Sequence, residues 1–179
     1  MIILDPDLES DQSRITNRRR SAAQTPRAQS RDNRVPSART LARFLCEAQS
    51  AVRLRGQVSV LLTTDNAIRR LNRQFRGKDK PTDVLSFPVL ARISRSRRWS
   101  PADRDIAGDL AISIPTARKQ AKTLGHALSI EIKVLMLHGL LHLAGYDHET
   151  DGGEMARREE RLRTKLRLPH GLIDRSVRA

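Results

Sequence analysis

Hydrophobic and polar residues follow two kinds of pattern along this chain, one typical of strands and the other of helices. Short apolar or alternating runs predict strands over residues 2–4, 58–62, 84–88 and 106–113. Apolar residues that recur every three or four positions predict helices over residues 37–55, 65–76, 115–124, 129–144 and 151–167. We therefore expect an α+β fold, in which one mixed sheet of about four strands is packed with about five helices.

Capping residues and helix breakers predict where these elements end. Ser37 and Asp65 have the side chains expected to cap the helices that follow them. Pro88 cannot donate a backbone hydrogen bond, so its strand is expected to end there or to lie at an edge of the sheet. Three glycines are expected to end helices, at Gly56, Gly125 and Gly145.

The length of 179 residues fits one domain, 1–179, whose apolar core needs no disulfide. Cys46 is the only cysteine; it lies in an apolar helical pattern and is expected to be a small core residue. Residues 9–35 are rich in Arg and nearly free of large apolar side chains, so we expect a mobile basic segment there. Residues 92–104 are expected to form a basic surface loop, and residues 169–179 a tail.

The formal net charge of +14 and a pI of about 11.4 favour a polyanionic partner, either nucleic acid or an anionic membrane surface. A basic solubility tail is the alternative explanation, because many of the arginines lie in the N-terminal segment. With three Phe, one Tyr and one Trp, a broad base-stacking platform is not expected. The N-terminus lacks signal-peptide features and no apolar run approaches about 20 residues, so we expect a cytoplasmic protein without a membrane partner.

Three of the five histidines fall within residues 138–148. His138 and His142 are four positions apart on a predicted helix, so both imidazoles project from one face and can reach one ion at about 2.0–2.1 Å. Gly145 permits a sharp turn that can bring His148 back as a third ligand. Three neutral imidazoles leave a tetrahedral zinc ion one position open to water. The other two histidines are expected to be ordinary core or surface residues.

This spacing matches the zinc-binding helix of the metzincin proteases, in which a glycine turn also precedes the third histidine. Gly139 stands where those proteases carry the Glu that acts as general base. Without that carboxylate, proteolysis by their mechanism lacks a proton acceptor, and a metalloprotease becomes the less favoured interpretation.

A second candidate group consists of Arg76, Lys78 and Lys80, just before the strand at residues 84–88. Basic side chains on a loop can position a phosphate, and the planar fork of Arg binds two phosphate oxygens at once. An exposed charged turn with weak surface ion pairs explains the same three residues equally well.

The motif HGLLHLAGYDH at residues 138–148, together with LNRQFRGKDKPTDVLSFP at 71–88 and GDLAIS at 108–113, resembles the YbeY family of bacterial endoribonucleases. The resemblance covers about residues 56–168. It implies a small α+β domain with a metzincin-like metal helix at the end of a cleft, one Zn²⁺ held by His138, His142 and His148, and a functional arginine at Arg76. The basic residues 9–35 match no motif of that family.

The resemblance implies a zinc-dependent endoribonuclease directed at single strands, acting in ribosomal RNA processing (small-subunit rRNA 3′-end maturation) and ribosome quality control. Its partners would be RNA and the ribosome or ribosome-associated proteins. In this interpretation Arg76 and the three histidines are catalytic, and Arg76, Lys78 and Lys80 bind substrate phosphate. The alternative is a non-catalytic ribosome-assembly or RNA-binding protein with structural zinc.

The sequence leaves the proton acceptor and the nucleophile open. Asp147 is a candidate base, but it can equally serve to orient its neighbour His148. The nucleophile is either water or the 2′-hydroxyl of the ribonucleotide.

Overall fold

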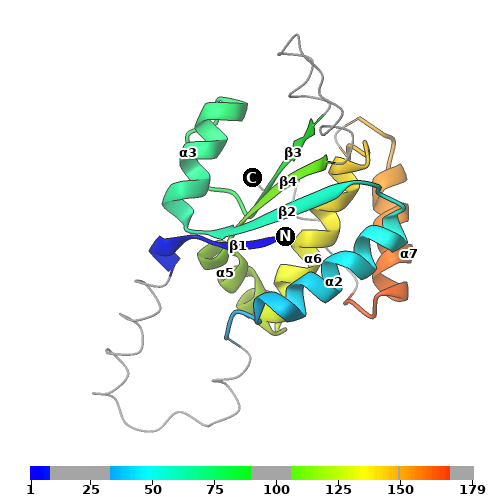
Figure 1. Ribbon diagram of the computed structural model, residues 1–179, viewed down its shortest axis with the longest axis horizontal. Helices are drawn as coiled ribbons and strands as arrows, with labels where there is room; N and C mark the ends of the chain where they lie inside the picture. Colours follow the sequence, from blue (N-terminus) through cyan, green and yellow to red (C-terminus); the bar gives the residue numbers. More distant parts are fainter. Residues whose placement is uncertain (9–32, 90–105, 149, 170–179) are drawn as a thin grey trace, which may run out of the picture.

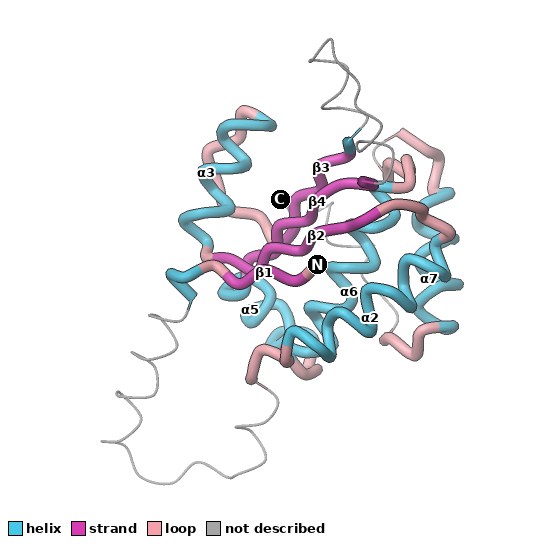
Figure 2. The backbone as a smooth tube through the Cα atoms, viewed as in Figure 1, coloured by secondary structure: helices cyan, strands magenta, loops and turns pink. Residues whose placement is uncertain are grey.

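The computed structural model describes residues 1–8, 33–89, 106–148 and 150–169, and these form one sheet and five helices of eleven residues or more (Figure 1, Figure 2). The strands are β1 (Ile2–Leu4), β2 (Gln57–Thr63), β3 (Val84–Pro88) and β4 (Ile106–Ser113). The helices are α2 (Ala38–Val52), α3 (Asp65–Arg76), α5 (Ile114–Leu124), α6 (Leu128–Leu143) and α7 (Glu154–Lys165). The predicted α+β class and the four-stranded mixed sheet are confirmed. The expected basic segment at 9–35, the loop at 92–104 and the tail at 169–179 lie wholly or largely outside the described residues.

The sheet has the order β1-β2-β4-β3. Strands β1, β2 and β4 run parallel, with Leu62 paired to Ile112, and β3 runs antiparallel to β4, with Ser86 paired to Leu110. Pro88 therefore ends a strand at the edge of the sheet, as predicted, where its missing N–H costs no ladder hydrogen bond.

The two faces of the sheet are covered unequally. Alternate residues of β2 and β4, among them Val60 and Leu110, pack into a large core that α2 and α6 also share. The opposite face carries a small cluster in which Ile68 of α3 packs on Leu85 and Ala111. Figure 1 shows α3 on one side of the sheet and α2, α6 and α7 on the other. The thin cover by α3 leaves part of that face open.

Helix α2 confirms one predicted boundary and contradicts two other expectations. The hydroxyl of Ser37 accepts a hydrogen bond from the Thr40 N–H, as expected of a cap. The helix ends at Val52, however, because Arg53 takes a left-handed conformation with φ 67°, three residues before Gly56. The expectation of a core cysteine was wrong as well, because Cys46 lies on the exposed side of this helix.

Helix α3 is capped by a neighbour of the predicted residue. The hydroxyl of Thr64 accepts from the Ala67 N–H, and Asp65 is the first helical residue. The Asp65 carboxylate instead accepts hydrogen bonds from Ser113 and from Thr116, the latter at 2.7 Å, and so ties α3 to the start of α5. Partial burial acts to raise the pKa of Asp65, but these hydrogen bonds and the charge of Lys119 outweigh burial and lower it.

Helix α6 is the central element, and it is buried on most sides against the sheet, α2, α5 and α7. Its core position explains why its apolar residues show almost no one-sided pattern. It begins at Leu128, one residue before the predicted start, and the predicted glycine stop of α5 is confirmed at Gly125, with φ 70°. None of the helices in the described ranges is by itself long and apolar enough to cross a membrane.

Helix α6 lies close against the sheet at Gly139. A Cβ atom at this position would lie 2.7 Å from the Cδ2 atom of Leu110 and 3.3 Å from the Ser86 hydroxyl. That hydroxyl donates a hydrogen bond to the Gly139 carbonyl at 3.3 Å. Position 139 thus faces the sheet, whereas His138 and His142 share a different face of the helix. There is no room at 139 for the glutamate that a metzincin carries.

We expect Gly139→Ala to lower the free energy of unfolding by about 1–3 kcal/mol, because the added methyl overpacks a fully buried contact. The same change should cost less in a Leu110→Ala background, where the opposing side chain has been removed. Urea denaturation of the four proteins of this double-mutant cycle measures the difference. An equal cost in both backgrounds would show that this contact does not limit position 139.

Candidate active site

Three histidines converge beyond the carboxyl end of α6. His138 and His142 lie on its last two turns, the chain then reverses at Gly145 with φ 91°, and His148 follows. One nitrogen from each of the three rings lies within 4.8 Å of the others. The ring centroids are separated by 4.8, 5.5 and 5.1 Å, and all three side chains are half-buried. The structure therefore brings together the three residues that the sequence motif singled out.

Hydrogen bonds orient two of the rings. His138 Nδ1 lies 3.0 Å from the Oε2 atom of Glu159 on α7, and His142 Nδ1 lies 3.0 Å from the backbone carbonyl of Tyr146. Both partners accept hydrogen bonds, so both Nδ1 atoms carry a proton. The Nε2 atoms of both rings are then left as lone-pair donors, which is the form that binds a metal.

The distance between these two Nε2 atoms fits a shared ion. They lie 3.1 Å apart, although neither carries a hydrogen to donate to the other. Two ligands of one tetrahedral zinc ion, each at about 2.0–2.1 Å, are separated by about 3.3–3.4 Å. Imidazole nitrogen also suits zinc and its neighbours among the transition metals. The residues present thus fit a three-nitrogen metal site.

Glu159 and Arg163 form a buried pair behind His138. Their side chains are each 2% exposed, and Arg163 Nε donates to Glu159 Oε1 at 2.9 Å. Burial acts to raise the pKa of Glu159, but the hydrogen bond and charge of His138 and the charge of Arg163 outweigh burial and lower it. Glu159 is therefore an ionised acceptor, which fixes the proton of His138 on Nδ1.

The pKa of His142 is lowered to about 4. Burial is the largest cause, followed by the charges of His138 and His148 and, more weakly, of Arg76, and together they exceed the opposing effect of the Tyr146 carbonyl. At neutral pH the His142 ring is uncharged, as a metal ligand must be.

Arg76 is the last residue of α3, and Gly77, in the left-handed conformation, ends the helix. The exposed Arg76 side chain helps to lower the pKa of His142 through its positive charge. Helix α3, which carries Arg76, and α6, which carries His142, lie on opposite faces of the sheet (Figure 1). Lys78 and Lys80 are exposed on the loop that follows. That loop is fixed by Asn72, whose amide donates to the Lys80 carbonyl at 2.8 Å, and by a two-pronged ion pair between Arg69 and Asp79.

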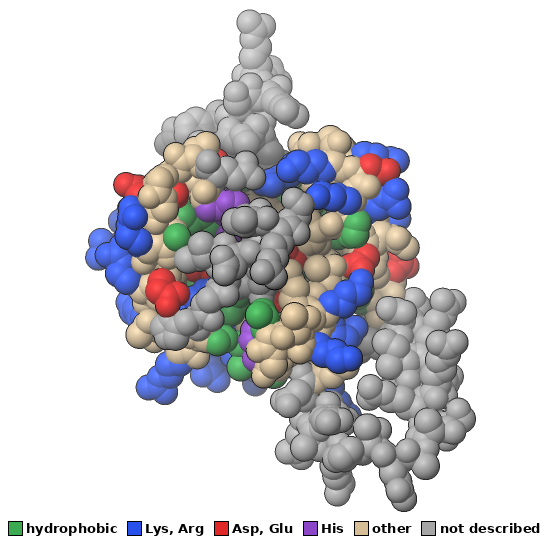
Figure 3. Space-filling view, turned by 180° about the vertical axis from the view of Figure 1, so that it is seen from behind, with side chains coloured by type: hydrophobic (Ala, Val, Ile, Leu, Met, Phe, Trp, Pro, Cys, Tyr) green, Lys and Arg blue, Asp and Glu red, His purple; other side chains and the backbone are tan. Residues whose placement is uncertain are grey.

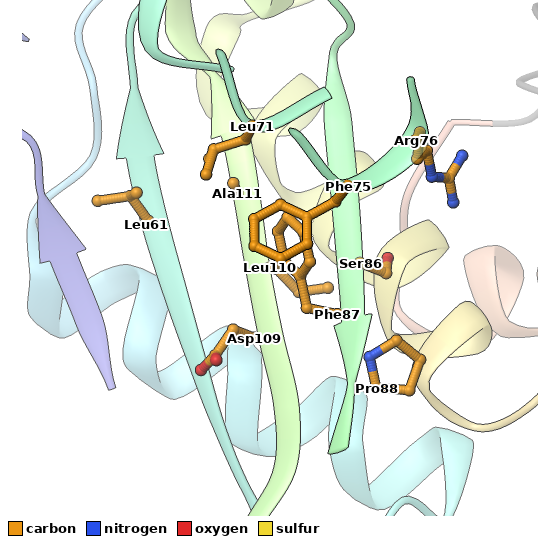
Figure 4. Close-up of a pocket in the computed structure, with 10 residues that line it drawn as sticks. All are labelled: Leu61, Leu71, Phe75, Arg76, Ser86, Phe87, Pro88, Asp109, Leu110 and Ala111. Carbon is orange, nitrogen blue, oxygen red and sulfur yellow. The ribbon is translucent and has the colours of Figure 1, made fainter. Parts of the chain in front are cut away.

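A cleft of about 550 Å³ lies between α3 and the open face of the sheet. Arg76 and Ser86 line its side nearest α6, and the rest of the lining is mostly apolar (Figure 4). Figure 3 shows histidine side chains reaching the molecular surface, with Lys and Arg side chains to both sides. Arg76 lines the cleft and also acts electrostatically on His142, so it links the cleft to the histidine cluster.

Sequence reasoning missed Glu159 and Arg163, although one feature of the sequence could have indicated the first. Met155, Glu159 and Leu162 share one face of α7, so a carboxylate stands in an otherwise apolar stripe. A charge at a core-facing position needs a partner, and here His138 and Arg163 are the partners. The cleft had no comparable indication, because its lining comes from α3, β2, β3 and β4 together.

The fold and the site define a small α+β protein with a three-histidine group that could hold a metal ion, and with a mostly apolar cleft that Arg76 lines at one end. The family model described as Endoribonuclease YbeY matches residues 24–167. An Endoribonuclease YbeY from Koribacter versatilis is 49% identical over 142 residues, 79% of this chain and 86% of the relative. Another from Nautilia profundicola is 50% identical over 119 residues, 66% of this chain and 78% of the relative. The chain belongs to the YbeY family.

A solved structure also resembles the chain. The solution structure of TM1509 from Thermotoga maritima is 28% identical, covers 74% of this chain and 85% of its own, and gives a TM-score of 0.48.

We expect His142 to be the neutral Nδ1–H tautomer in metal-free protein at pH 7, because its pKa is low and the Tyr146 carbonyl faces Nδ1. Long-range ¹H–¹⁵N NMR distinguishes the tautomers. His126 is the internal control, since its Nε2 faces the buried carboxylate of Glu131 and should carry a proton. A protonated His142 Nε2 would contradict this description of the site.

Proposed function

We propose that this protein is a zinc-dependent endoribonuclease directed at single-stranded RNA, acting in ribosomal RNA maturation, including small-subunit rRNA 3′-end formation, and in ribosome quality control in the cytoplasm. The observation that carries the proposal is the convergence of His138, His142 and His148 beside Arg76. The family description, Endoribonuclease YbeY, supports hydrolysis of RNA. The net charge of +14 supports a polyanionic substrate.

In this proposal each group of residues has a separate task. His138, His142 and His148 hold one Zn²⁺, which when bound supplies a Lewis acid and lowers the pKa of water. The guanidinium of Arg76 binds the phosphoryl oxygens of the scissile group, where negative charge grows during the reaction. Lys78 and Lys80 bind neighbouring phosphates of the same strand.

Asp147 is the candidate proton acceptor. It lies directly before His148 in the turn after α6, where its carboxylate accepts a hydrogen bond from the Thr150 hydroxyl at 3.3 Å. Attack by water with Asp147 as base would leave an open-chain phosphate on the product. A 2′,3′-cyclic phosphate end would instead identify the ribose hydroxyl as nucleophile and contradict the water route.

The structure disfavours the two alternatives for specific reasons. A structural zinc ion usually has four protein ligands. The group of potential metal ligands among the described residues consists of three histidines. A metalloprotease needs a carboxylate at position 139, where a Cβ atom would lie 2.7 Å from Leu110 Cδ2 and leave no room for a larger side chain.

The first test compares metal content and RNA cleavage in the wild type and three variants. His138→Ala should lose both zinc and cleavage. Arg76→Ala should retain zinc and cleave about 10²–10³-fold more slowly, because one donor to the developing charge is gone. Arg70→Ala is the charge-matched control: it lies on the same helix, does not line the cleft and should cleave normally.

Several results of this test would overturn the proposal. Cleavage that survives complete removal of zinc would exclude a zinc-dependent reaction, and full zinc binding by His138→Ala would exclude the assigned ligands. Normal RNA binding and folding with no cleavage by the zinc-loaded wild type would favour the non-catalytic assembly protein. Chelator-sensitive digestion of casein would favour the protease.

We also expect Glu159→Gln to weaken zinc binding by about 10- to 100-fold, because the neutral amide is a poorer acceptor for the Nδ1–H of His138. Competition with a chromophoric chelator measures the affinity. Glu160→Gln, a neighbouring change on the same helix outside the His138 contact, is the control. Equal affinities in wild type and Glu159→Gln would show that this hydrogen bond does not tune the metal site.

A further inference from the structure

Helix α3 carries a row of arginines along one side. Arg69, Arg73 and Arg76 follow the spacing i, i+4, i+7, so their side chains project from one face of the helix, and all three are exposed. At 1.5 Å per residue the row spans about 10 Å. The negative end of the helix dipole favours cations in the last turn, which explains Arg73 and Arg76 singly but does not explain the basic loop that follows them.

That loop folds back along the row of arginines. The Lys78 N–H donates to the Asn72 carbonyl at 3.3 Å, and the Asn72 side-chain amide donates to the Lys80 carbonyl at 2.8 Å. Between these two points, the Asp79 carboxylate accepts two hydrogen bonds of 2.9 Å from Arg69. The loop therefore returns beside the helix, and it holds the exposed side chains of Lys78 and Lys80 next to the arginines.

Asp79 is an acidic residue among five exposed basic ones. The hydrogen bonds from Arg69 are the largest cause that lowers the pKa of Asp79, and the charges of Arg69 and Arg73 add to them. The paired side chains are 50% and 49% exposed, so the pair contributes little to the stability of the fold. A carboxylate also weakens the attraction of a surface for phosphate. What Asp79 does provide is a fixed loop. We call the five basic residues the basic track: Arg69, Arg73, Arg76, Lys78 and Lys80.

We propose that the basic track binds the phosphate backbone of the RNA strand on one side of the scissile group, with Arg73 as a further phosphate contact and Asp79 as a positioning residue. The proposal rests on the proposed endoribonuclease function, which places the scissile phosphate at Arg76. Phosphate contacts fix the register of a strand without reading its bases, so the track accepts strands of any sequence. Asp79 acts through the loop, because it keeps Lys78 and Lys80 in line with the arginines.

The role of Arg73 is tested by fluorescence anisotropy, with a labelled single-stranded oligoribonucleotide titrated with the full chain at several salt concentrations. Arg73→Gln should weaken binding about fivefold at about 0.1 M salt, and it should reduce the slope of log Kd against log salt by about 0.7, the value for one phosphate of a single strand. Arg70→Gln is the matched control, because it removes the same charge from the same helix outside the row, and it should keep the wild-type slope. An unchanged slope in Arg73→Gln would exclude Arg73 from the track.

Asp79→Asn is a variant for which two explanations predict opposite signs. If the surface attracts RNA by charge alone, removal of a carboxylate tightens binding. If Asp79 positions the loop, the variant should bind RNA about fivefold more weakly, the loss of one phosphate contact. Glu47→Gln removes an exposed carboxylate from α2 and should bind RNA as the wild type does. Tighter binding by Asp79→Asn, in a protein that unfolds at the wild-type temperature, would overturn the positioning role.

An anionic membrane surface also attracts basic helices, so vesicles serve as the competing partner. Arg73→Gln should weaken RNA binding more than it weakens sedimentation with phosphatidylserine vesicles. Loss of vesicle binding without loss of RNA binding would assign the track to a membrane and overturn the proposal.

Cleavage assays distinguish failure of this proposal from failure of the enzymatic function. In the zinc-loaded protein, Arg73→Gln and Asp79→Asn should each raise KM about fivefold with little change in kcat. Wild-type KM values in both variants would refute the track and leave the endoribonuclease intact. RNA binding that depends on Arg73, without cleavage by the zinc-loaded wild type, would refute the enzyme and leave the track.

Discussion

The site depends on the hydrogen bonds that fix the Nδ1 protons of His138 and His142. The Glu159 carboxylate and the Tyr146 carbonyl accept hydrogen bonds from these two N–H groups. Both Nε2 atoms therefore carry lone pairs, and they lie 3.1 Å from each other. Such an arrangement is repulsive without a cation and favourable with one. Arg163 in turn neutralises Glu159 within the core, so α7 holds the charge on which the orientation of His138 depends.

The close contact between α6 and the sheet determines where His138 and His142 lie relative to the strands. Gly139 lets the helix lie directly on Leu110, and Ser86 bonds to its backbone. The histidines are thereby held beside the edge strand, within electrostatic reach of Arg76 from the far face of the sheet. The same contact removes the space that a protease-type glutamate would need, so one packing constraint both positions the metal-type site and limits its chemistry.

The cleft between α3 and the sheet is lined mostly by apolar side chains, unlike the basic loop that follows Arg76. Among the described residues, Phe75 and Phe87 of this lining form an edge-to-face aromatic pair. Arg76 at one end and Asp109 at the other are the charged residues of this lining.

The sequence by itself determined the elements, the strand at the sheet edge and the three histidines, because helix and strand periods and an i, i+4 spacing are local properties. It also indicated Arg76 through a family motif. It misplaced Cys46, whose burial depends on which side of α2 meets the core. Glu159, Arg163 and the cleft lining were decided by tertiary structure alone. Their contacts join residues from separate elements (His138 to Glu159, and Phe75 to Phe87), and only the packing of α7 on α6 and of α3 on the sheet creates them.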